Sequence, residues 1–447
     1  MIVSPVFSGK RFAVLGLARS GQAAVECLLA SGAHVMAWDA RDEPRQLFAG
    51  RVELADPVIS DLTGYDGIVV SPGIPLNRHP IAQVAAVAGV PVIGDIELFA
   101  QARRSLPDHR VVGITGTNGK STTTALTAHL LETGGLPVRM GGNIGLPILG
   151  EDPLYPNGNG PGTYVLELSS YQLDLTRSLD CDIAILLNIT PDHLDRYDGF
   201  PAYAASKARL FAMQGIGQLA IVDYAAEVDL DVMAGAPDGQ PFQFIGGVEL
   251  PGDQSEWPSL QGPHNLGNAA AAVAAARWLG VDDAAIERGL KSFCGLPHRM
   301  ERIAEANGVL YVNDSKATNP ASTAPALAAY PPNPDRRIHW ICGGLPKGED
   351  LDECRPWFGN VAAAYTIGEA GPLFADILAP YMPVHRSELM AEAIRHAMEA
   401  SQPGDVVLLS PACASFDQFR DYEARGDAFR RIVESFLAEG ATPAGAG

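Results

Sequence analysis

The strongest chemical signal in this sequence is a glycine-rich loop of the phosphate-binding kind. Residues 113–122 read Gly-Ile-Thr-Gly-Thr-Asn-Gly-Lys-Ser-Thr, between an apolar run and a helical pattern that stops at Gly134. Backbone N–H groups of such a turn, with the helix N-terminus, close around phosphate oxygens. In this pattern Lys120 would reach the β- and γ-phosphates and the Ser121 hydroxyl would ligate Mg²⁺. The strict pattern GxxxxGK[ST] fails by one place, because position 114 is Ile, yet the setting favours a nucleotide site over an ordinary turn.

Two further polar side chains lie at or after the carboxyl ends of predicted strands. Glu167 lies in the apolar strand 164–168, and His193 follows the strand predicted over 181–188. Because the carboxyl ends of parallel strands share one edge of a sheet, both should converge with Lys120. That position favours a metal-ligand role for Glu167 over a carboxylate that faces water. His193 alone would suit a loop cap equally well, and its place beside the phosphate loop favours a functional role.

Spacing alone says little about three other segments. Lys207 lies in a helix predicted over 204–210, where a surface position is the default expectation. Residues 214–260 are predicted to be rich in loops and carry no recognisable chemistry. The Asn residues within 264–268 are predicted to cap the alanine-rich helix 269–279.

The first hundred residues contain a separate βαβ pattern. A strand, a glycine turn, a helix and a second strand are predicted over 11–16, 16–21, 22–30 and 33–38. Asp39 ends the second strand, which gives the outline of a dinucleotide site. Ala18 replaces the middle glycine of GxGxxG, so the fingerprint is weak for NAD. A further strand over 65–70 ends in the small residues 71–75, and a nucleotide-like ligand is favoured over a pure scaffold.

The last third of the chain repeats the βα pattern three times. Strands are predicted over 309–312, 338–341 and 406–409, each followed by a loop with hydroxyl or lysine side chains, at 313–320, 342–348 and 410–415. Pro320 suits the first turn of a helix, and another helix is predicted around 416–422. The repetition predicts a domain with a ligand-binding edge.

Length and composition limit the number of domains, the class of partner and the cellular compartment. The 447 residues predict three domains, over 1–98, 99–297 and 298–447. The fold class is α/β, with a Rossmann-like N-terminal domain, a P-loop-type central ATPase and a Rossmann-like C-terminal domain. The net charge of −20 argues against a nucleic-acid partner. Six scattered cysteines, no signal-peptide pattern and no membrane-spanning stretch indicate a cytoplasmic protein, which we expect to be a monomer.

The motifs together resemble the Mur ligases, the ATP-dependent amide-bond enzymes of peptidoglycan precursor synthesis. The resemblance rests on residues 113–122, 167–170, 188–195, 264–268, 313–319 and 410–419 and spans nearly the whole chain. It implies a role in cell wall biogenesis, and thereby in cell shape and division. It also implies that ATP activates the carboxylate of UDP-N-acetylmuramoyl-L-alanine (UDP-MurNAc-L-Ala) as an acyl phosphate. The amine of D-glutamate would then displace the phosphate.

The same resemblance implies the residues of each site. ATP would be bound by Gly116, Thr117, Asn118, Gly119, Lys120, Ser121, Thr122, Asn268, Arg299 and Asp314. The UDP-substrate would be bound by Leu17, Ser20, Asp39, Ser71 and Asn143. D-Glutamate would be bound by Thr318, Lys347, Ser415, Phe416 and Tyr422, the last standing where a Phe is usual in the family. Two Mg²⁺ ions would be held by Ser121, Glu167, His193 and a carbamylated Lys207. The catalytic residues would be Lys120, His193 and Lys207.

Three alternatives come from other classes of protein. A folylpolyglutamate synthase would share the phosphate loop but would lack the N-terminal UDP-type domain. A nicotinamide dehydrogenase would explain that domain but would leave Lys120, Glu167 and His193 idle. A nucleotide-sensing binding protein would need the loop but not a third domain with Lys347 and Ser415.

Overall fold

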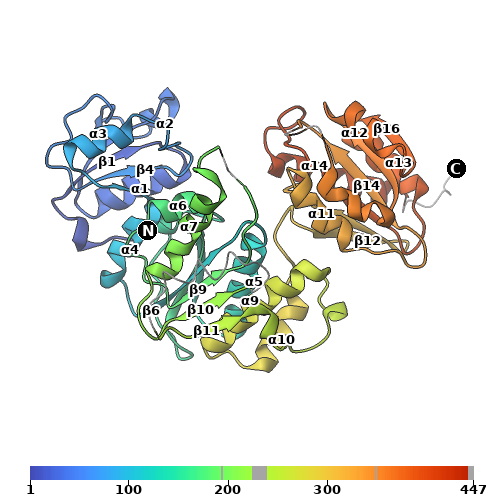
Figure 1. Cartoon of the computed structure of the whole chain (residues 1–447), viewed down its shortest axis with the longest axis horizontal. Helices are drawn as coiled ribbons and strands as arrows, with labels where there is room; N and C mark the ends of the chain where they lie inside the picture. The colour runs from blue at the N-terminus through green and yellow to red at the C-terminus, as the bar shows by residue number, and fades with distance from the viewer. Residues whose placement is uncertain (193–194, 224–238, 347, 349, 441–447) are drawn as a thin grey trace. The chain divides into compact units, whose positions relative to one another are not determined.

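The computed structural model describes residues 1–192, 195–223, 239–346, 348 and 350–440. The chain forms two compact units, Met1–Pro251 with Gly267–Gly289, and Gly252–Leu266 with Leu290–Gly447. The first unit contains two β-sheets and the second contains one (Figure 1). The three sheets fit the expected α/β class, whereas the domain boundaries at 98 and 297 stay a prediction.

The first sheet carries the predicted βαβ pattern. Its strands are all parallel, in the order β3-β2-β1-β4-β5. The strands are β1 (Arg11–Leu15), β2 (His34–Trp38), β3 (Glu53–Leu54), β4 (Gly67–Val70) and β5 (Val92–Ile93), and the helices are α1 (Arg19–Ala30), α2 (Asp42–Gln46), α3 (Ile81–Ala88) and α4 (Asp95–Ala102). Phe12 and Val14 of β1 belong to one apolar cluster and Ala13 and Leu15 to another, so both faces of the sheet are covered.

The second sheet places the phosphate loop at its centre. Its parallel order is β11-β10-β9-β6-β8-β7. The strands are β6 (His109–Thr115), β7 (Val138–Gly142), β8 (Gly162–Glu167), β9 (Ile183–Leu186), β10 (Leu219–Val222) and β11 (Phe242–Phe244), and the helices are α5 (Lys120–Thr133), α6 (Ser170–Asp174), α7 (Gly199–Ala212), α9 (Pro263–Trp278) and α10 (Asp283–Ser292). Because β6 lies between β8 and β9, the loops after these three strands share one edge. One apolar cluster runs from Phe12 of the first sheet to Leu186 of β9 and joins the two sheets.

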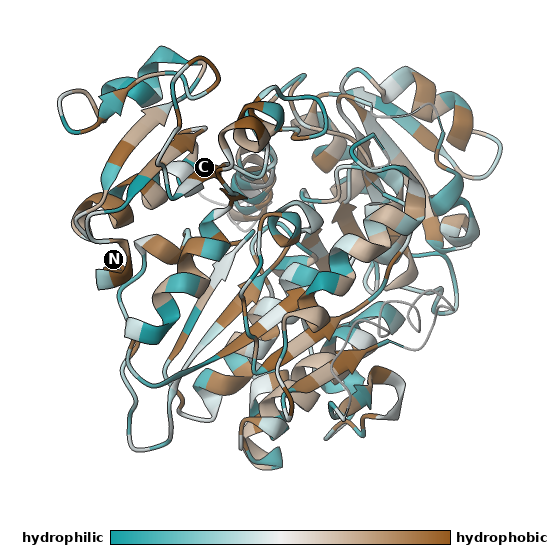
Figure 2. Ribbon diagram, turned by 60° about the vertical axis from the view of Figure 1, so that its left-hand side comes forward, coloured by the Kyte–Doolittle hydropathy of each residue, from teal (hydrophilic) through white to brown (hydrophobic). Residues whose placement is uncertain are grey.

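The third sheet belongs to the second unit. Its order is β12-β13-β17-β14-β15-β16, and only β12 is antiparallel to its neighbour among the described pairs. The strands are β12 (Glu301–Ala306), β13 (Val309–Asn313), β14 (Ile338–Gly343), β15 (Val361–Ile367), β16 (Val384–Glu388) and β17 (Val406–Leu409), and the helices are α11 (Pro320–Ala328), α12 (Gly371–Leu378), α13 (Met390–Ala400) and α14 (Tyr422–Gly440). Trp340 and Ile341, adjacent in β14, belong to clusters on opposite faces. In Figure 2 many strand segments are coloured brown, as hydrophobic residues, and parts of the helices are brown as well.

The helix expected after β17 begins later than predicted. The helix predicted around 416–422 begins only at Tyr422, because Asp421 Oδ1 accepts the N–H of Ala424 (2.7 Å) and caps it. Before it, the carbonyl of Ser415 accepts the N–H of Phe419 (2.8 Å) in a loop. The described residues of the segment 214–260, predicted to be rich in loops, contain two short strands, β10 and β11, with loops and short 3-10 helices around them.

The helix predicted over 269–279 begins earlier, with Pro263. Asn265 and Asn268 therefore lie inside α9 and do not cap it, which corrects the composition argument. Short 3-10 helices complete the description: η1 (Pro5–Phe7), η2 (Arg103–Ser105), η3 (Ile148–Gly150), η4 (Ile245–Gly247), η5 (Gln254–Glu256) and η6 (Asp352–Asn360). No helix in the described part of the chain is both long and apolar enough to cross a membrane.

Candidate active site

The loop between β6 and α5 is held in shape by Asn188. Thr117 N donates to Asn188 O (2.9 Å), and Asn118 N donates to Asn188 Oδ1 (2.8 Å). Asn188 Nδ2 donates in return to Asn118 O (3.0 Å). Lys120 Nζ donates to the carbonyls of Gly116 (2.9 Å) and Thr117 (2.8 Å), so its ammonium lies over the loop. The predicted strand–loop–helix arrangement is confirmed, and Asn188 supports it from the end of β9.

Gly119 ends this loop where only glycine fits easily. Its φ is +84°, and a Cβ there would lie 2.3 Å from Asn268 Oδ1. Asn268 belongs to α9 and accepts a hydrogen bond from Thr123 Oγ1 of α5 (3.2 Å). The predicted ATP residue Asn268 therefore borders the phosphate loop directly.

Gly119→Ala is expected to raise the KM for ATP by about tenfold or more, because the added methyl displaces Asn268 and the loop. Gly217→Ala is the matched control: Gly217 has φ +88° but nothing within 4 Å of an added Cβ. Both variants place an L side chain at a positive φ, which strains the backbone, so both should lower the melting temperature modestly. Steady-state kinetics distinguish them, and an unchanged KM for ATP in Gly119→Ala would remove this loop from the nucleotide site.

Glu167 is buried at the end of β8 and does not face water. It lies opposite Ile114 of β6 in the sheet register and is 2% exposed. Its Oε1 accepts from Asn143 Nδ2 (2.9 Å), whereas Oε2 is buried without a hydrogen-bond partner. A buried carboxylate oxygen in that state is costly unless a cation meets it. Glu167 thus fits a metal ligand, and Asn143, predicted for the UDP-substrate, lies against this carboxylate.

The side chains around Glu167 limit how a cation would be held. The described residues contain no group of three or more His, Cys, Asp or Glu side chains arranged for a metal ion. Hydroxyl groups and nucleotide phosphates are further oxygen ligands of the kind that Mg²⁺ prefers beside a carboxylate such as Glu167. Ser121, buried in the first turn of α5, is a hydroxyl of that kind.

Lys207 is buried, so the surface position expected from spacing alone is wrong. It is 1% exposed, because α7 packs against the central strands of its sheet. Its Nζ donates to Gly116 O (2.9 Å) and lies 4.7 Å from the centroid of the Tyr203 ring. Burial, followed by the positive charge of Lys120, lowers the pKa of Lys207 to about 7. Nearby carboxylates, including Glu167, oppose that shift.

The glycine turn after β1 gathers four residues predicted for the UDP-substrate. These are Leu17, Ser20, Asp39 and Ser71. Leu17 N donates to Asp39 Oδ2 (2.7 Å), Arg41 N donates to Oδ1 (3.0 Å), and Ser71 Oγ donates to Gly16 O (2.8 Å). Burial raises the pKa of Asp39, but the hydrogen bonds from these amides outweigh it and leave the pKa below its usual value. Asp39 therefore holds the turn, and its contact with a ligand stays a prediction.

Asp314 is buried in the second unit, at the end of β13. Ser410 Oγ donates to its Oδ2 (2.7 Å), and Met300 N donates to its Oδ1 (3.2 Å). Burial raises the pKa of Asp314 to about 7. The hydrogen bond from Ser410 and the positive charge of Arg299 act in the opposite direction and lower the pKa, but burial outweighs them. Because β13 pairs with β17, the loops after these strands meet as predicted.

The residues predicted for D-glutamate lie in loops and at one helix start. Thr318 follows β13, Ser415 and Phe416 follow β17, and Tyr422 begins α14. Ser415 is buried and Phe416 is 70% exposed. Lys316 Nζ lies 3.8 Å from the centroid of the Tyr422 ring. Lys347, together with His193 of the predicted metal set, lies outside the described residues.

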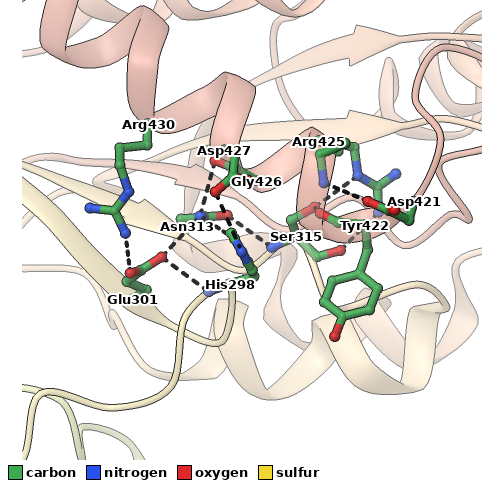
Figure 3. Close-up of polar contacts among 11 residues, drawn as sticks. His298, Glu301, Asn313, Ser315, Asp421, Tyr422, Arg425, Gly426, Asp427 and Arg430 are labelled. Carbon is green, nitrogen blue, oxygen red and sulfur yellow. Dashed lines mark hydrogen bonds and ion pairs between the residues drawn. The ribbon is translucent and has the colours of Figure 1, made fainter. Parts of the chain in front are cut away.

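Arg425 is a residue of this region that sequence reasoning missed. It is 1% exposed, and Nη2 donates to the carbonyls of Ser315 (2.8 Å) and Cys413 (3.0 Å), while Nη1 donates to that of Ala414 (3.1 Å). The guanidinium therefore ties the loop after β13 to the loop after β17. Figure 3 shows Arg425 beside Ser315 of the first of these loops. An arginine within a helical pattern carries no signal of such a role.

Comparisons with known proteins agree with this geometry. Three family models match: "Mur ligase MurD-like, N-terminal domain" at residues 10–94, "Mur ligase middle domain" at 114–237 and "Mur ligase, glutamate ligase domain" at 298–413. A UDP-N-acetylmuramoylalanine–D-glutamate ligase of Novosphingobium aromaticivorans is 66% identical over 99% of this chain and 98% of its own length. Ligases of the same name from Sphingopyxis alaskensis and Zymomonas mobilis are 60% and 53% identical, over 98% and 97% of this chain and 100% of their own lengths.

Solved structures share the fold at low identity. The MurF ligase of Thermotoga maritima in complex with ADP aligns with a TM-score of 0.58 and 19% identity, over 98% of this chain and 96% of that chain. A UDP-N-acetylmuramate–alanine ligase of the same organism gives a TM-score of 0.57 and 18% identity, over 96% of this chain and 99% of that chain.

A phosphate loop beside a buried carboxylate and a buried lysine, in an α/β chain of three sheets, defines an ATP-dependent enzyme. This site and the relatives that match over the full length together identify the family of the enzyme. The chain belongs to the Mur ligase family and is an ATP-dependent amide-bond-forming ligase. ATP and Mg²⁺ are the cosubstrate and cofactor of that family.

Proposed function

We propose that this chain joins D-glutamate to UDP-MurNAc-L-Ala with the cleavage of ATP, in cytoplasmic peptidoglycan precursor synthesis. The observation that carries the proposal is the identity of 53–66% to three ligases named for this reaction, over 97% or more of the chain. The match over 10–94 also disfavours a folylpolyglutamate synthase, which would lack that domain. A dehydrogenase would leave the phosphate loop unused.

In the first step the carboxylate of the alanyl group attacks the γ-phosphorus of ATP, which breaks the bond to the β,γ-bridging oxygen, forms the acyl phosphate and releases ADP. Negative charge spreads over the transferring phosphoryl oxygens, and positioned cations lower the energy of that state. Lys120 is proposed to supply one such charge, because its ammonium lies over the phosphate loop, within 2.9 Å of Gly116 O. Asn188 holds the loop in shape through its hydrogen bonds to Asn118, and Asn268 borders the loop at Gly119.

Bound Mg²⁺ supplies further charge neutralisation at the phosphates. Ser121 and Glu167 fit one ion, on the strength of the unpartnered Glu167 Oε2. His193, which lies outside the described residues, is proposed to ligate a second ion. Asn143 orients the Glu167 carboxylate through its hydrogen bond to Oε1 (2.9 Å).

Lys207 is proposed to carry a carbamate that helps to hold the second ion. Carbamate formation needs a neutral amine, and burial already lowers the pKa of Lys207 to about 7. The modification also converts a buried cation, whose Nζ donates to Gly116 O (2.9 Å), into an anion suited to a metal site.

In the second step the amine of D-glutamate attacks the acyl phosphate. The two carboxylates of this substrate need cationic or hydroxyl partners, which Lys347, Thr318 and Ser415 are proposed to supply. Arg299 and Asp314 are proposed to contact the adenosine half of ATP. We further propose that the turn after β1, with Asp39 and Ser71, binds the uridine diphosphate.

The reaction is tested by incubating the protein with ATP, Mg²⁺ and UDP-MurNAc-L-Ala, with and without D-glutamate. Phosphate release and a product heavier by one glutamyl residue, measured by mass spectrometry, are expected only with D-glutamate. L-Alanine offered with UDP-N-acetylmuramate, and meso-diaminopimelate in place of D-glutamate, should give no product. Efficient ligation of L-alanine would move the chain to another branch of the family.

The same assay tests the amino-acid site. Lys347→Ala should raise the KM for D-glutamate by about tenfold and leave that for ATP nearly unchanged, since a charge-assisted contact to a carboxylate is lost. An equal rise in both values would argue against a role confined to D-glutamate.

A further inference from the structure

The segment that carries Arg299 has an unusual backbone. His298 and Met300, on either side of it, have φ values of 62° and 46°. L residues other than glycine seldom occupy this left-handed region, and they persist there only when surrounding contacts fix them. Arg299 itself is tied by its N–H to Leu296 O (3.2 Å). The direction of its side chain thus depends on what holds the two flanking residues.

Two carboxylates hold the flanking amides. Glu301 Oε2 accepts the N–H of His298 (3.0 Å), and Asp314 Oδ1 accepts that of Met300 (3.2 Å). Asp314 already belongs to the proposed nucleotide site, whereas Glu301 has no assigned role. Glu301 is the first residue of β12 and lies opposite Asn313 in the register with β13.

Glu301 is itself fixed from two sides. Asn313 Nδ2 donates to its Oε2 (3.1 Å), and the guanidinium of Arg430 in α14 pairs with its Oε1 (Figure 3). Its side chain is only 13% exposed. Asn313 Nδ2 also contacts His298 Nδ1 (3.0 Å) and Gly426 O (3.2 Å), so α14, the end of β13 and the 298–300 segment form one polar network.

We propose that Glu301, supported by Arg430, is a positioning residue for ATP: it holds His298 in its left-handed conformation and so directs the side chain of the neighbouring Arg299 to the nucleotide. This inference rests on the proposed contact between Arg299 and ATP. In this proposal Glu301 holds the His298 amide and does not itself contact the nucleotide. Without its carboxylate the His298 amide loses its acceptor, and the segment relaxes to ordinary φ values that turn Arg299 away.

The experiment compares Glu301→Ala and Glu301→Gln with a matched control, Glu305→Ala. Glu305 lies on the same strand and forms an ion pair with Arg302 (2.8 Å), but its side chain is 60% exposed. The full chain is assayed for the dissociation constant of ADP, for the KM values of ATP and D-glutamate, and for the melting temperature. Glu301→Ala should weaken ADP binding and raise the KM for ATP by about tenfold, with the KM for D-glutamate unchanged.

The conservative variant separates positioning from stability. Glu301→Gln keeps an oxygen that accepts the His298 N–H but loses the ion pair with Arg430, so it should restore most of the ADP affinity. Glu305→Ala should leave ADP affinity and both KM values as in the unmodified chain. A lower melting temperature with ADP affinity within about twofold in Glu301→Ala would overturn the inference and leave Glu301 a structural residue.

A double-variant cycle tests whether Glu301 acts through Arg299. Arg299→Ala should weaken ADP binding, and adding Glu301→Ala to it should weaken binding no further. If the double variant instead loses ADP affinity by the product of the two single-variant factors, Glu301 acts independently of Arg299 and the inference is overturned. If Arg299→Ala binds ADP normally, the proposed contact of Arg299 is wrong and the inference fails with it, while ligation by the unmodified chain would still uphold the proposed reaction.

Discussion

Lys120→Ala should lose ligase activity by about a thousandfold or more while keeping its fold. The side chain is only half-buried, and its ammonium contacts the loop carbonyls of Gly116 and Thr117, not the apolar core. Removing it therefore leaves the sheet and α5 packed as before. The cost appears in phosphoryl transfer, where one of the charges that stabilise the transferring group is missing.

Phosphate release under saturating substrates measures that loss, and thermal unfolding measures the fold. Lys291→Ala is the matched control, because Lys291 forms an exposed ion pair with Glu256 (2.9 Å) and lies outside the proposed site. Its activity should match that of the unmodified chain. If Lys120→Ala keeps near-normal turnover with normal ATP affinity, the assignment of the phosphate loop is wrong.

The sequence allowed much of the fold to be predicted. Strands buried on both faces read as continuous apolar runs, which is why β17 was predicted with its observed bounds, Val406–Leu409. The strand–loop–helix around Lys120 followed from glycine and helix patterns, and Pro320 begins α11 as expected. Side chains at the ends of parallel strands could be grouped because topology places those ends on one edge.

Features set by tertiary contacts could not be predicted in this way. A lysine in a helix is most often exposed, and only the packing of α7 shows that Lys207 is buried. The first turn of α9 contains Pro263 and polar residues, so composition placed its start too late. Arg425 binds the Ser315 carbonyl, 110 residues away, and Glu301 is held by Arg430, 129 residues away, and no local pattern predicts such contacts.

Activity should fall in rigorously CO₂-depleted buffer and return when bicarbonate is added, if Lys207 carries a carbamate. The neutral amine attacks CO₂, and a pKa lowered to about 7 by burial leaves a large neutral fraction at pH 7–8. Incubation with ¹³C-labelled bicarbonate should give a carbamate carbon signal by NMR that is absent from Lys207→Met. This readout does not depend on turnover.

Lys207→Ala should be nearly inactive and should regain part of its activity with a small carboxylate such as acetate. The side chain lies in a buried space beside Gly116 O and the Tyr203 ring, so truncation to Ala leaves room for an anion where the carbamate stood. Lys207→Met fills most of the same space and should stay inactive with acetate, which separates chemical rescue from a general effect of the salt. Full activity of Lys207→Ala without any additive would show that neither the amine nor its carbamate takes part, and that the buried lysine serves only to pack α7 against the sheet.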